Sequence, residues 1–180
     1  MTFIENKLKY TQNLNIFITT KNSKSKVTVE GPLGILNLET PYFIQLNKEK
    51  KELILLKKIT TKIEKQLINT YTALLTNMFV GVTKGYSVTL KLVGVGFKAE
   101  VVENFLVLKL GFSHEVKFKI DPRIKISIIK ATTIVIFGLN KQNILNTAAQ
   151  IQKIKAPEPY KGKGILFQNK IIRRKQGKVK

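Results

Sequence analysis

The chain has 180 residues, of which 43% are apolar, and it carries a formal net charge of +21 with no Cys. That apolar content is sufficient for a buried core and excludes a chain that is disordered throughout. The absence of Cys excludes disulfides, thiolate metal sites and cysteine catalysis. No apolar run approaches the ~20 residues that span a bilayer, so we expect a soluble protein. Its excess charge favours a polyanionic partner, nucleic acid before an anionic membrane surface.

The first part of the sequence is typical of short antiparallel strands. Its clearest segment is "KVTVEGPLGILNLE", in which Val27 and Val29 share one face before a Gly-Pro-Leu-Gly turn. Pro and Gly at such positions predict a tight hairpin. Two further apolar runs, "YFIQL" and "ELILL", are expected to complete a small sheet.

A helix is predicted in "TTKIEKQLINTYTALLTNMFVG", because its apolar residues recur in steps of three and four. Thr60 or Thr61 can cap the start of this helix, and Gly81 can end it. We expect the apolar stripe to pack against the sheet. The stripe comprises Ile63, Leu67, Ile68, Tyr71, Leu74, Leu75, Met78 and Phe79.

The second half repeats this plan of strands followed by a helix. Asn140 is the expected cap of a helix in "KQNILNTAAQIQKI", which must stop before Pro157. A turn is expected at Glu103-Asn104. Strands are predicted in "YSVTLKLVGVGFKAEV", "FLVLKL", "EVKFKI", "IKISII" and "TIVIF". The apolar helix face is predicted to hold Ile144, Leu145, Ala148, Ala149 and Ile151.

These patterns predict an α+β protein of two tandem small domains, each an antiparallel sheet with one helix packed on a face, plus a basic C-terminal extension. We place the first domain at residues 1–82 and the second at 83–180, with the basic tail at 155–180. Sequence similarity between the halves is faint, so the repeat is a hypothesis about topology only.

Two features of the sequence resemble parts of small-molecule sites. "GVGFKA" matches a loose dinucleotide-binding pattern, but a strand follows it where a helix is needed, so Gly94 and Gly96 are predicted to form a bulge or a close backbone approach. His114 is the only histidine, and nothing nearby in sequence points to an orienting carboxylate, so we expect a local hydrogen bond or a surface position. The chain is therefore expected to have no catalytic residues, cofactor, metal or small-molecule substrate.

The positive charge is concentrated in residues 155–180, which hold nine basic residues and one acidic residue. In "PEPYKGKG" the prolines fix the chain direction, and Tyr160 can stack on a base or a sugar. The glycines remove side chains, so the backbone and the flanking lysines can approach phosphates closely. The candidate phosphate-binding residues of this loop are Lys161, Gly162, Lys163 and Gly164.

Arg173 and Arg174 follow the loop and are two of only three arginines in the chain. The planar guanidinium group suits a phosphate or a guanine edge in a way that Lys cannot mimic. Ile171 and Ile172 are expected to anchor a short strand from which these cations project. A solvated basic tail with no specific role is the alternative that composition alone leaves open.

"PEPYKGKG", followed by "IIRRKQGK" at Ile171–Lys178, resembles the C-terminal signature of the family of bacterial-type large-subunit ribosomal protein six. Further matches keep the family's order and roughly its spacing from about Lys26 onward. They are "VTVEGPLGIL", "NMFVGVTKGY", "LVGVGFKAE" and "GFSHEV".

The resemblance implies a structural, non-catalytic role in the large ribosomal subunit, supporting translation. It implies that the second domain and tail bind large-subunit ribosomal RNA near the sarcin–ricin loop and the factor-binding region. It also implies that the first domain lies toward the stalk base, beside neighbouring large-subunit ribosomal proteins. RNA contact carries over to the matching positions Tyr160, Lys161, Gly162, Lys163, Gly164, Arg173, Arg174, Lys175 and Lys178, and to Lys84 and Lys98.

The sequence also departs from the family pattern. "MTFIENKLKYTQNLNI" replaces the usual basic start, and Glu115 stands where proline is common. The strong preference for Lys over Arg, and a start unlike a secretory signal or a transit peptide, agree with a diverged member encoded in an organelle. We expect a ribosome of the mitochondrial matrix, with a plastid or a bacterial cytoplasm as the alternative compartment. The alternative function is a free-standing basic nucleic-acid-binding protein outside the ribosome. Neither predicted helix is strongly basic, so we do not expect a membrane partner.

Overall fold

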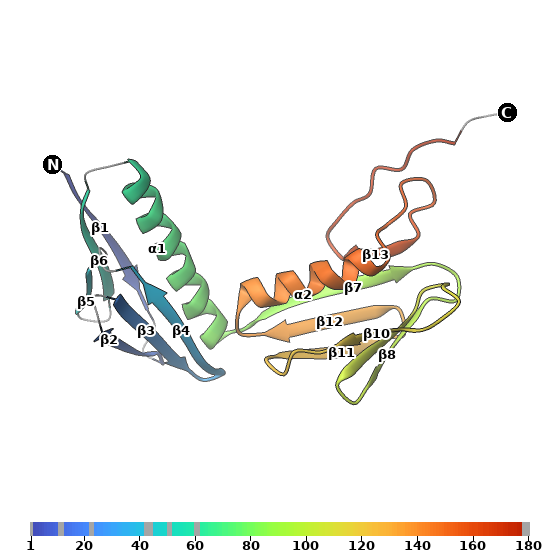
Figure 1. Cartoon of the computed structure of the whole chain (residues 1–180), viewed down its shortest axis with the longest axis horizontal. Coiled ribbons are helices and arrows are strands. Elements are labelled where there is room, and N and C mark those ends of the chain that lie inside the picture. Colours follow the sequence, from blue (N-terminus) through green and yellow to red (C-terminus); the bar gives the residue numbers. More distant parts are fainter. Residues whose placement is uncertain are drawn as a thin grey trace. The chain divides into compact units, whose positions relative to one another are not determined.

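The computed structural model describes residues 2–10, 13–21, 24–41, 45–49, 52–59 and 62–177. The chain divides into two compact units, Met1–Gly85 and Tyr86–Lys180 (Figure 1). The predicted domain break after residue 82 falls inside the last turn of a helix that ends at Thr83. In the described residues, no helix combines the length and apolar character needed to cross a membrane.

The first unit packs a helix against antiparallel strands. Its strands are β1 (Thr2–Lys9), β2 (Asn15–Lys21), β3 (Lys24–Gly31), β4 (Gly34–Thr40), β5 (Gln45–Glu49) and β6 (Glu52–Ile59). One sheet has the order β1-β6-β5 and another has the order β2-β3-β4. Helix α1 (Lys62–Thr83) contacts strands of both sheets. The buried core comprises Leu14, Ile16, Val27, Val29, Leu53, Leu75, Met78, Phe79 and Val82.

The predicted hairpin is confirmed as β3–β4, in which Gly31 pairs with Gly34 across a two-residue turn. The end of α1 packs directly on this turn, since the Leu33 amide donates to the Val82 carbonyl at 3.2 Å. A Cβ atom on Gly31 would lie only 2.5 Å from Val82 Cγ1. Glycine at this position therefore permits the close approach of the helix as well as the turn.

The predicted end of α1 at Gly81 is wrong. The helix continues to Thr83, and the amides of Lys84 and Gly85 both donate to the Val80 carbonyl, at 2.8 and 3.2 Å. Gly85 has a φ of 74°, so the residue that closes the helix is this later glycine. At the start of the helix, Ile63 was expected in the packed apolar stripe, but its side chain is 68% exposed. The predicted caps, Thr60 and Thr61, lie outside the described residues.

The second unit also combines a helix with antiparallel strands. The strands are β7 (Tyr86–Val93), β8 (Lys98–Val102), β9 (Phe105–Lys109), β10 (Val116–Lys119), β11 (Ile124–Lys130), β12 (Thr133–Gly138) and β13 (Gly164–Phe167). One sheet has the order β11-β12-β7-β13 and another has the order β10-β9-β8. Helix α2 (Lys141–Ile154) contacts β7, β12 and β13. Buried residues from both sheets and from α2 form a single apolar cluster.

The α+β class with two tandem small domains is confirmed, and each unit distributes its described strands over two sheets. The "ELILL" run lies in β6, while residues 42–44 of "YFIQL" lie outside the described residues. Strand β1 was not predicted. In α2, Ile144 and Ala148 are buried as expected, but Leu145 is 43% exposed.

The predicted cap of α2 is confirmed. The Asn140 side-chain oxygen accepts hydrogen bonds from the amides of Gln142 at 2.9 Å and Asn143 at 3.4 Å. The helix ends at Ile154, before Pro157, as the sequence predicted.

Asn140→Ala is expected to lower the free energy of unfolding by about 1 kcal/mol, because it leaves the first amides of α2 without their acceptor. The matched control is Asn146→Ala, an exposed position within the same helix, where alanine is the better helix former. Urea-induced unfolding measures both variants. Equal losses of stability in the two variants would contradict the capping role.

Candidate nucleic-acid interface

The segment after α2 forms a closed loop, which we call the basic loop (residues 157–164) (Figure 1). The Gly162 amide donates to the Glu158 carbonyl at 3.0 Å, and the Glu158 amide donates to the Lys163 carbonyl at 2.9 Å. The Ile165 amide donates to the Lys155 carbonyl at 2.9 Å where the loop closes. The chain then returns as β13, which pairs antiparallel with β7. The predicted turn is therefore an ordered element tied to the sheet.

The two glycines of the basic loop are required by the protein's own packing. Gly162 and Gly164 have φ values of 71° and 143°, which side-chain-bearing residues rarely adopt. A Cβ atom on Gly164 would lie 2.7 Å from Pro157 Cα and 2.8 Å from the Ala156 carbonyl oxygen. A Cβ atom on Gly162 would lie 3.3 Å from Arg174 Nε. Both glycines are buried, while the lysines beside them are exposed.

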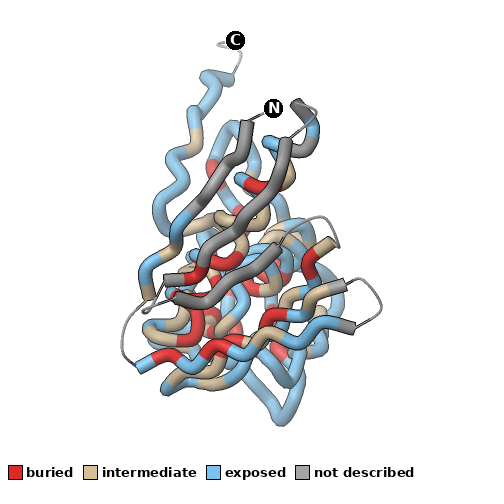
Figure 2. Tube along the Cα trace, turned by 90° about the vertical axis from the view of Figure 1, so that its left-hand side faces the viewer, coloured by how far each residue is buried: buried red, intermediate tan, exposed pale blue. Residues whose placement is uncertain are grey.

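The chain beyond β13 folds back onto the basic loop. The Lys175 amide donates to the Pro159 carbonyl at 2.9 Å, and the Arg174 side chain lies against Gly162. Most of this returning segment is exposed, as Figure 2 shows near the C label. The structure therefore brings two cationic stretches together. Their exposed side chains are Tyr160, Lys161, Lys163, Arg173, Arg174 and Lys175.

The predicted anchor of this segment is wrong. Residues 171–177 do not form a strand, and Ile171 is 95% exposed, while Ile172 is only half-buried. The strand is Gly164–Phe167, and its anchor is Ile165, which is fully buried. The Gln152 side-chain amide also donates to the Ile165 carbonyl at 3.2 Å. Helix α2 and strand β7 thus hold the basic loop in place, and the Lys175 amide ties the returning segment to the loop.

The remaining predicted site residues are more scattered. Lys98 is exposed at the start of β8, opposite Lys109 in the antiparallel register. Lys84 is exposed just beyond α1 in the first unit, so it does not belong to the loop that holds the other residues. Lys178 lies outside the described residues.

Sequence reasoning missed a stack of side chains beside the basic loop. The Lys155 ammonium lies 4.3 Å from the centroid of the Phe112 ring, and this ring stacks on His114 with centroids 6.2 Å apart. Phe112 is 41% exposed, although it is a large aromatic residue. The sequence offered one signal, a phenylalanine in a turn beside a histidine. Its pairing with a lysine far along the chain depends on the fold.

Glu115, the residue that departs from the family pattern, forms an ion pair with Lys109 at 2.9 Å. The hydrogen bond that Lys109 donates to the Glu115 carboxylate, and then the negative charge of that carboxylate, raise the pKa of Lys109. Since the folded pKa is raised, this stabilisation is complete below the ordinary lysine value and is lost as pH rises through the raised value. Both side chains are about half exposed, so the pair contributes little to stability at neutral pH.

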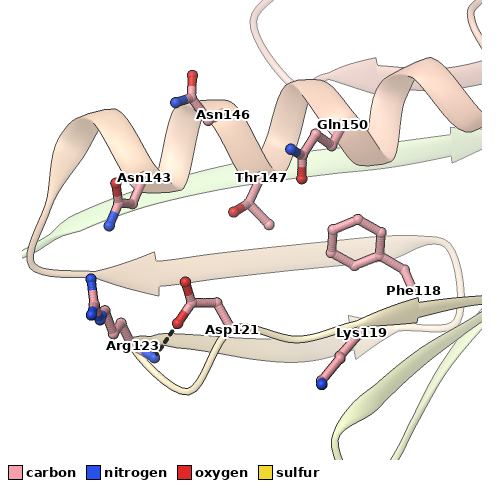
Figure 3. Close-up of a pocket in the computed structure, with 8 residues that line it drawn as sticks. All are labelled: Phe118, Lys119, Asp121, Arg123, Asn143, Asn146, Thr147 and Gln150. Atoms are coloured by element: carbon pink, nitrogen blue, oxygen red, sulfur yellow. Dashed lines mark hydrogen bonds between the residues drawn. The ribbon is translucent and has the colours of Figure 1, made fainter.

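A polar hollow of about 350 Å³ lies between α2 and the strands below it (Figure 3). Thr147 and Gln150 reach into it from the helix, with Phe118 and Asp121 on the opposite side. The Asp121 carboxylate already accepts a hydrogen bond from the Arg123 amide at 2.9 Å. Across the described part of the chain, no cluster of three His, Cys, Asp or Glu side chains could hold a metal ion.

The sequence was compared with known proteins. The model of the family described as Ribosomal protein L6 matches residues 18–85 and 93–168. These two stretches fall in the first and second unit respectively, and both lie upstream of the arginine pair.

Several curated relatives cover most of the chain. The large ribosomal subunit protein uL6m of Reclinomonas americana is 41% identical over 181 residues, covering 96% of each protein. The protein uL6 of Chloroherpeton thalassium is 39% identical over 154 residues, covering 86% of each. The protein uL6c of Arabidopsis thaliana is 43% identical over 152 residues, covering 84% of this chain and 68% of the relative.

The family predicted from the sequence motifs is thus confirmed by a match across both units and by relatives well above 30% identity. The expectation that the chain is not an enzyme is confirmed by the same membership. The chain belongs to the Ribosomal protein L6 family, the structural proteins of the large ribosomal subunit.

Proposed function

We propose that the second unit binds large-subunit ribosomal RNA through the basic loop and the segment that folds back on it. The hydrogen bond from the Lys175 amide to the Pro159 carbonyl carries this proposal, because it joins two cationic stretches into one surface. Phosphate groups are the natural partners of such a surface, since Lys and Arg supply the contacts that position a protein on a nucleic-acid backbone. The residues proposed to contact RNA are Tyr160, Lys161, Gly162, Lys163, Gly164, Arg173, Arg174, Lys175 and Lys178, with Lys84 and Lys98 at further positions.

The proposal also includes a location within the large ribosomal subunit. The RNA site is proposed to lie near the sarcin–ricin loop and the factor-binding region, with the first unit beside neighbouring ribosomal proteins at the stalk base. The family resemblance supports this placement. In the first unit, the aromatic Phe17 on β2 is 55% exposed and Ile35 on β4 is 56% exposed, one on each side of β3, which agrees with protein neighbours there.

The compartment is proposed to be the mitochondrial matrix, with the gene in the organelle. The relative from Reclinomonas americana carries a mitochondrial name and aligns with nearly the whole chain. Plastid and bacterial relatives match at similar identity, so a plastid or a bacterial cytoplasm is the alternative. Cell fractionation with an antibody against the chain would assign the compartment.

Binding of the full chain to transcribed large-subunit RNA, with small-subunit RNA as the control, tests the proposed function. We expect tighter binding to large-subunit RNA, with an affinity that falls as salt rises because phosphate contacts release counterions. Equal affinity for both RNAs would favour a free-standing basic nucleic-acid-binding protein instead. Failure to bind large-subunit RNA at low salt would contradict the proposal.

A further inference from the structure

A hollow of about 500 Å³ opens beside the basic loop in the second unit. Three connections far apart in sequence form it: the turn between β7 and β8, the chain just beyond β9, and the segment after α2. Its volume is within the range of sites that hold small ligands. The lining residues used below are Val95, Phe97, Leu110, Lys155, Glu158 and Lys163.

The floor of this hollow is apolar and fixed. Phe97 is 8% exposed and Leu110 is 1% exposed. The Phe97 ring packs tightly on the backbone, because a Cβ atom on Gly94 would lie 2.8 Å from it and one on Gly111 would lie 3.4 Å from it. Because both side chains are almost fully covered, they form a small apolar floor that needs no rearrangement before a ligand binds.

The wall formed by the segment after α2 is equally rigid. The Lys155 carbonyl accepts from the Ile165 amide, and the Glu158 amide donates to the Lys163 carbonyl, each at 2.9 Å. Gly164 packs so closely on this wall that its missing Cβ atom would lie 2.9 Å from the Lys155 carbonyl oxygen. The hollow is therefore preformed by the same contacts that hold the basic loop.

The rim combines positive charge with exposed apolar surface. Lys155 and Lys163 supply two ammonium groups, and Val95 is 93% exposed at the edge of the floor. Phe112 and His114 form the adjacent stack, on which Lys155 also lies. Exposed apolar surface beside cations complements a nucleotide, which has an apolar base face and an anionic phosphate.

We infer that this hollow, which we call the base pocket, holds one unpaired nucleotide of the bound RNA. The base lies against the exposed Val95 side chain at the edge of the floor, and the adjoining phosphates face Lys155 and Lys163. Sequence-specific RNA recognition generally targets unstacked bases that are splayed out and stacked on aromatic side chains. This inference rests on the proposed function, since it assigns one nucleotide of the RNA that the basic loop binds.

Glu158 sets the base preference of the pocket. It is the only acidic residue among residues 155–180, and its backbone is fixed by two hydrogen bonds within the basic loop. An ionised carboxylate only accepts hydrogen bonds, so it favours a base edge that donates. Guanine presents two adjacent donors, its ring N–H and its amino group, whereas the ring N–H of uracil lies between two carbonyl oxygens that repel a carboxylate. We therefore expect guanine to be preferred and uracil to be rejected.

Footprinting of the full chain on transcribed large-subunit RNA tests the base pocket. Hydroxyl radicals report backbone protection, while kethoxal, dimethyl sulfate and a carbodiimide report the pairing edges of guanine, of adenine and cytosine, and of uracil. The wild-type chain is expected to protect a backbone tract and one unpaired guanine within it. Ala156→Trp, which fills the pocket from its exposed wall, should expose that guanine and weaken binding about 10-fold, since the contacts of one base are lost.

Ala73→Trp adds the same side chain to an exposed position of α1 in the first unit and should leave both footprints unchanged. If Ala156→Trp keeps the backbone footprint and every base protection, the base pocket is wrong while the proposed function stands. If the wild-type chain leaves no backbone footprint, the proposed function itself fails. If Ala156→Trp loses the whole footprint, the Glu158→Gln variant tests the base pocket in its place. Weaker guanine protection within an intact backbone footprint supports the base pocket, and unchanged guanine protection overturns it.

Discussion

Arg173→Glu combined with Arg174→Glu is expected to weaken binding to large-subunit RNA by about 100-fold or more. A hydrogen bond to a charged group contributes about 1.5–3 kcal/mol, and the double variant removes two such donors and adds two repulsive charges. Both guanidinium groups are exposed on the segment that folds back onto the basic loop. The slope of log affinity against log salt should become shallower by about two units, because about two fewer phosphates are neutralised.

The salt dependence of RNA binding, together with co-sedimentation with large subunits, measures this effect. Lys26→Glu combined with Lys65→Glu makes the same change in net charge at exposed positions of the first unit and should have a much smaller effect. Arg173→Lys combined with Arg174→Lys separates charge from shape, since Lys keeps the charge but lacks the planar fork. An unchanged salt slope and unchanged co-sedimentation in the glutamate variant would remove the arginine pair from the interface.

Gly164→Ala is expected to destabilise the second unit by about 2–4 kcal/mol, because it combines backbone strain with a steric clash. The φ of Gly164 is 143°, and the added Cβ atom would lie 2.7 Å from Pro157 Cα. Relief of this clash must move backbone, so the hydrogen bond between Ile165 and Lys155 should be lost with the loop closure. Urea-induced unfolding measures the stability, and amide exchange at Ile165 reports the local opening.

Gly177→Ala is the matched control. No atom lies within 4 Å of its expected Cβ position, so its stability should change by no more than about 0.5 kcal/mol. RNA affinity should fall in the Gly164 variant as well, since the displaced loop carries Lys161 and Lys163. A Gly164 variant with wild-type stability and wild-type exchange at Ile165 would show that the close packing of the loop is not required.

The elements with strong local signals were predictable from the sequence. The β3–β4 hairpin follows from alternating apolar residues on either side of a Pro and Gly turn. The start of α2 follows from the capping chemistry of Asn140, and its end follows from Pro157. In each of these cases the signal and the structure it specifies lie within a few residues of one another.

The features that depend on tertiary contacts were missed. Strand β1 has Glu5 and Lys7 within its run, and it is a strand because it pairs along its length with β6. The helix end was placed at Gly81, but two glycines of that segment look alike in sequence, and only Gly85 adopts positive φ. A local pattern cannot distinguish a glycine inside a helix from one that closes it.

The candidate interface likewise combines features that follow from local sequence with features that depend on tertiary contacts. The motif "PEPYKGKG" predicted a turn with exposed lysines, and the structure has one. The anchor was misassigned to Ile171, because a short apolar run beside cations looks like a strand, whereas β13 comes earlier and packs on β7. The stack of Lys155 on Phe112 joins residues that are distant in sequence, so no local pattern could predict it.

Crosslinking in assembled large subunits tests the central claim most directly. A photoreactive phenylalanine in place of Tyr160, which is 52% exposed on the basic loop, would crosslink to whatever the loop touches. Mapping of the attached nucleotides should place them in large-subunit RNA, at or beside the sarcin–ricin loop. Crosslinks confined to small-subunit RNA, or to protein alone, would contradict the account.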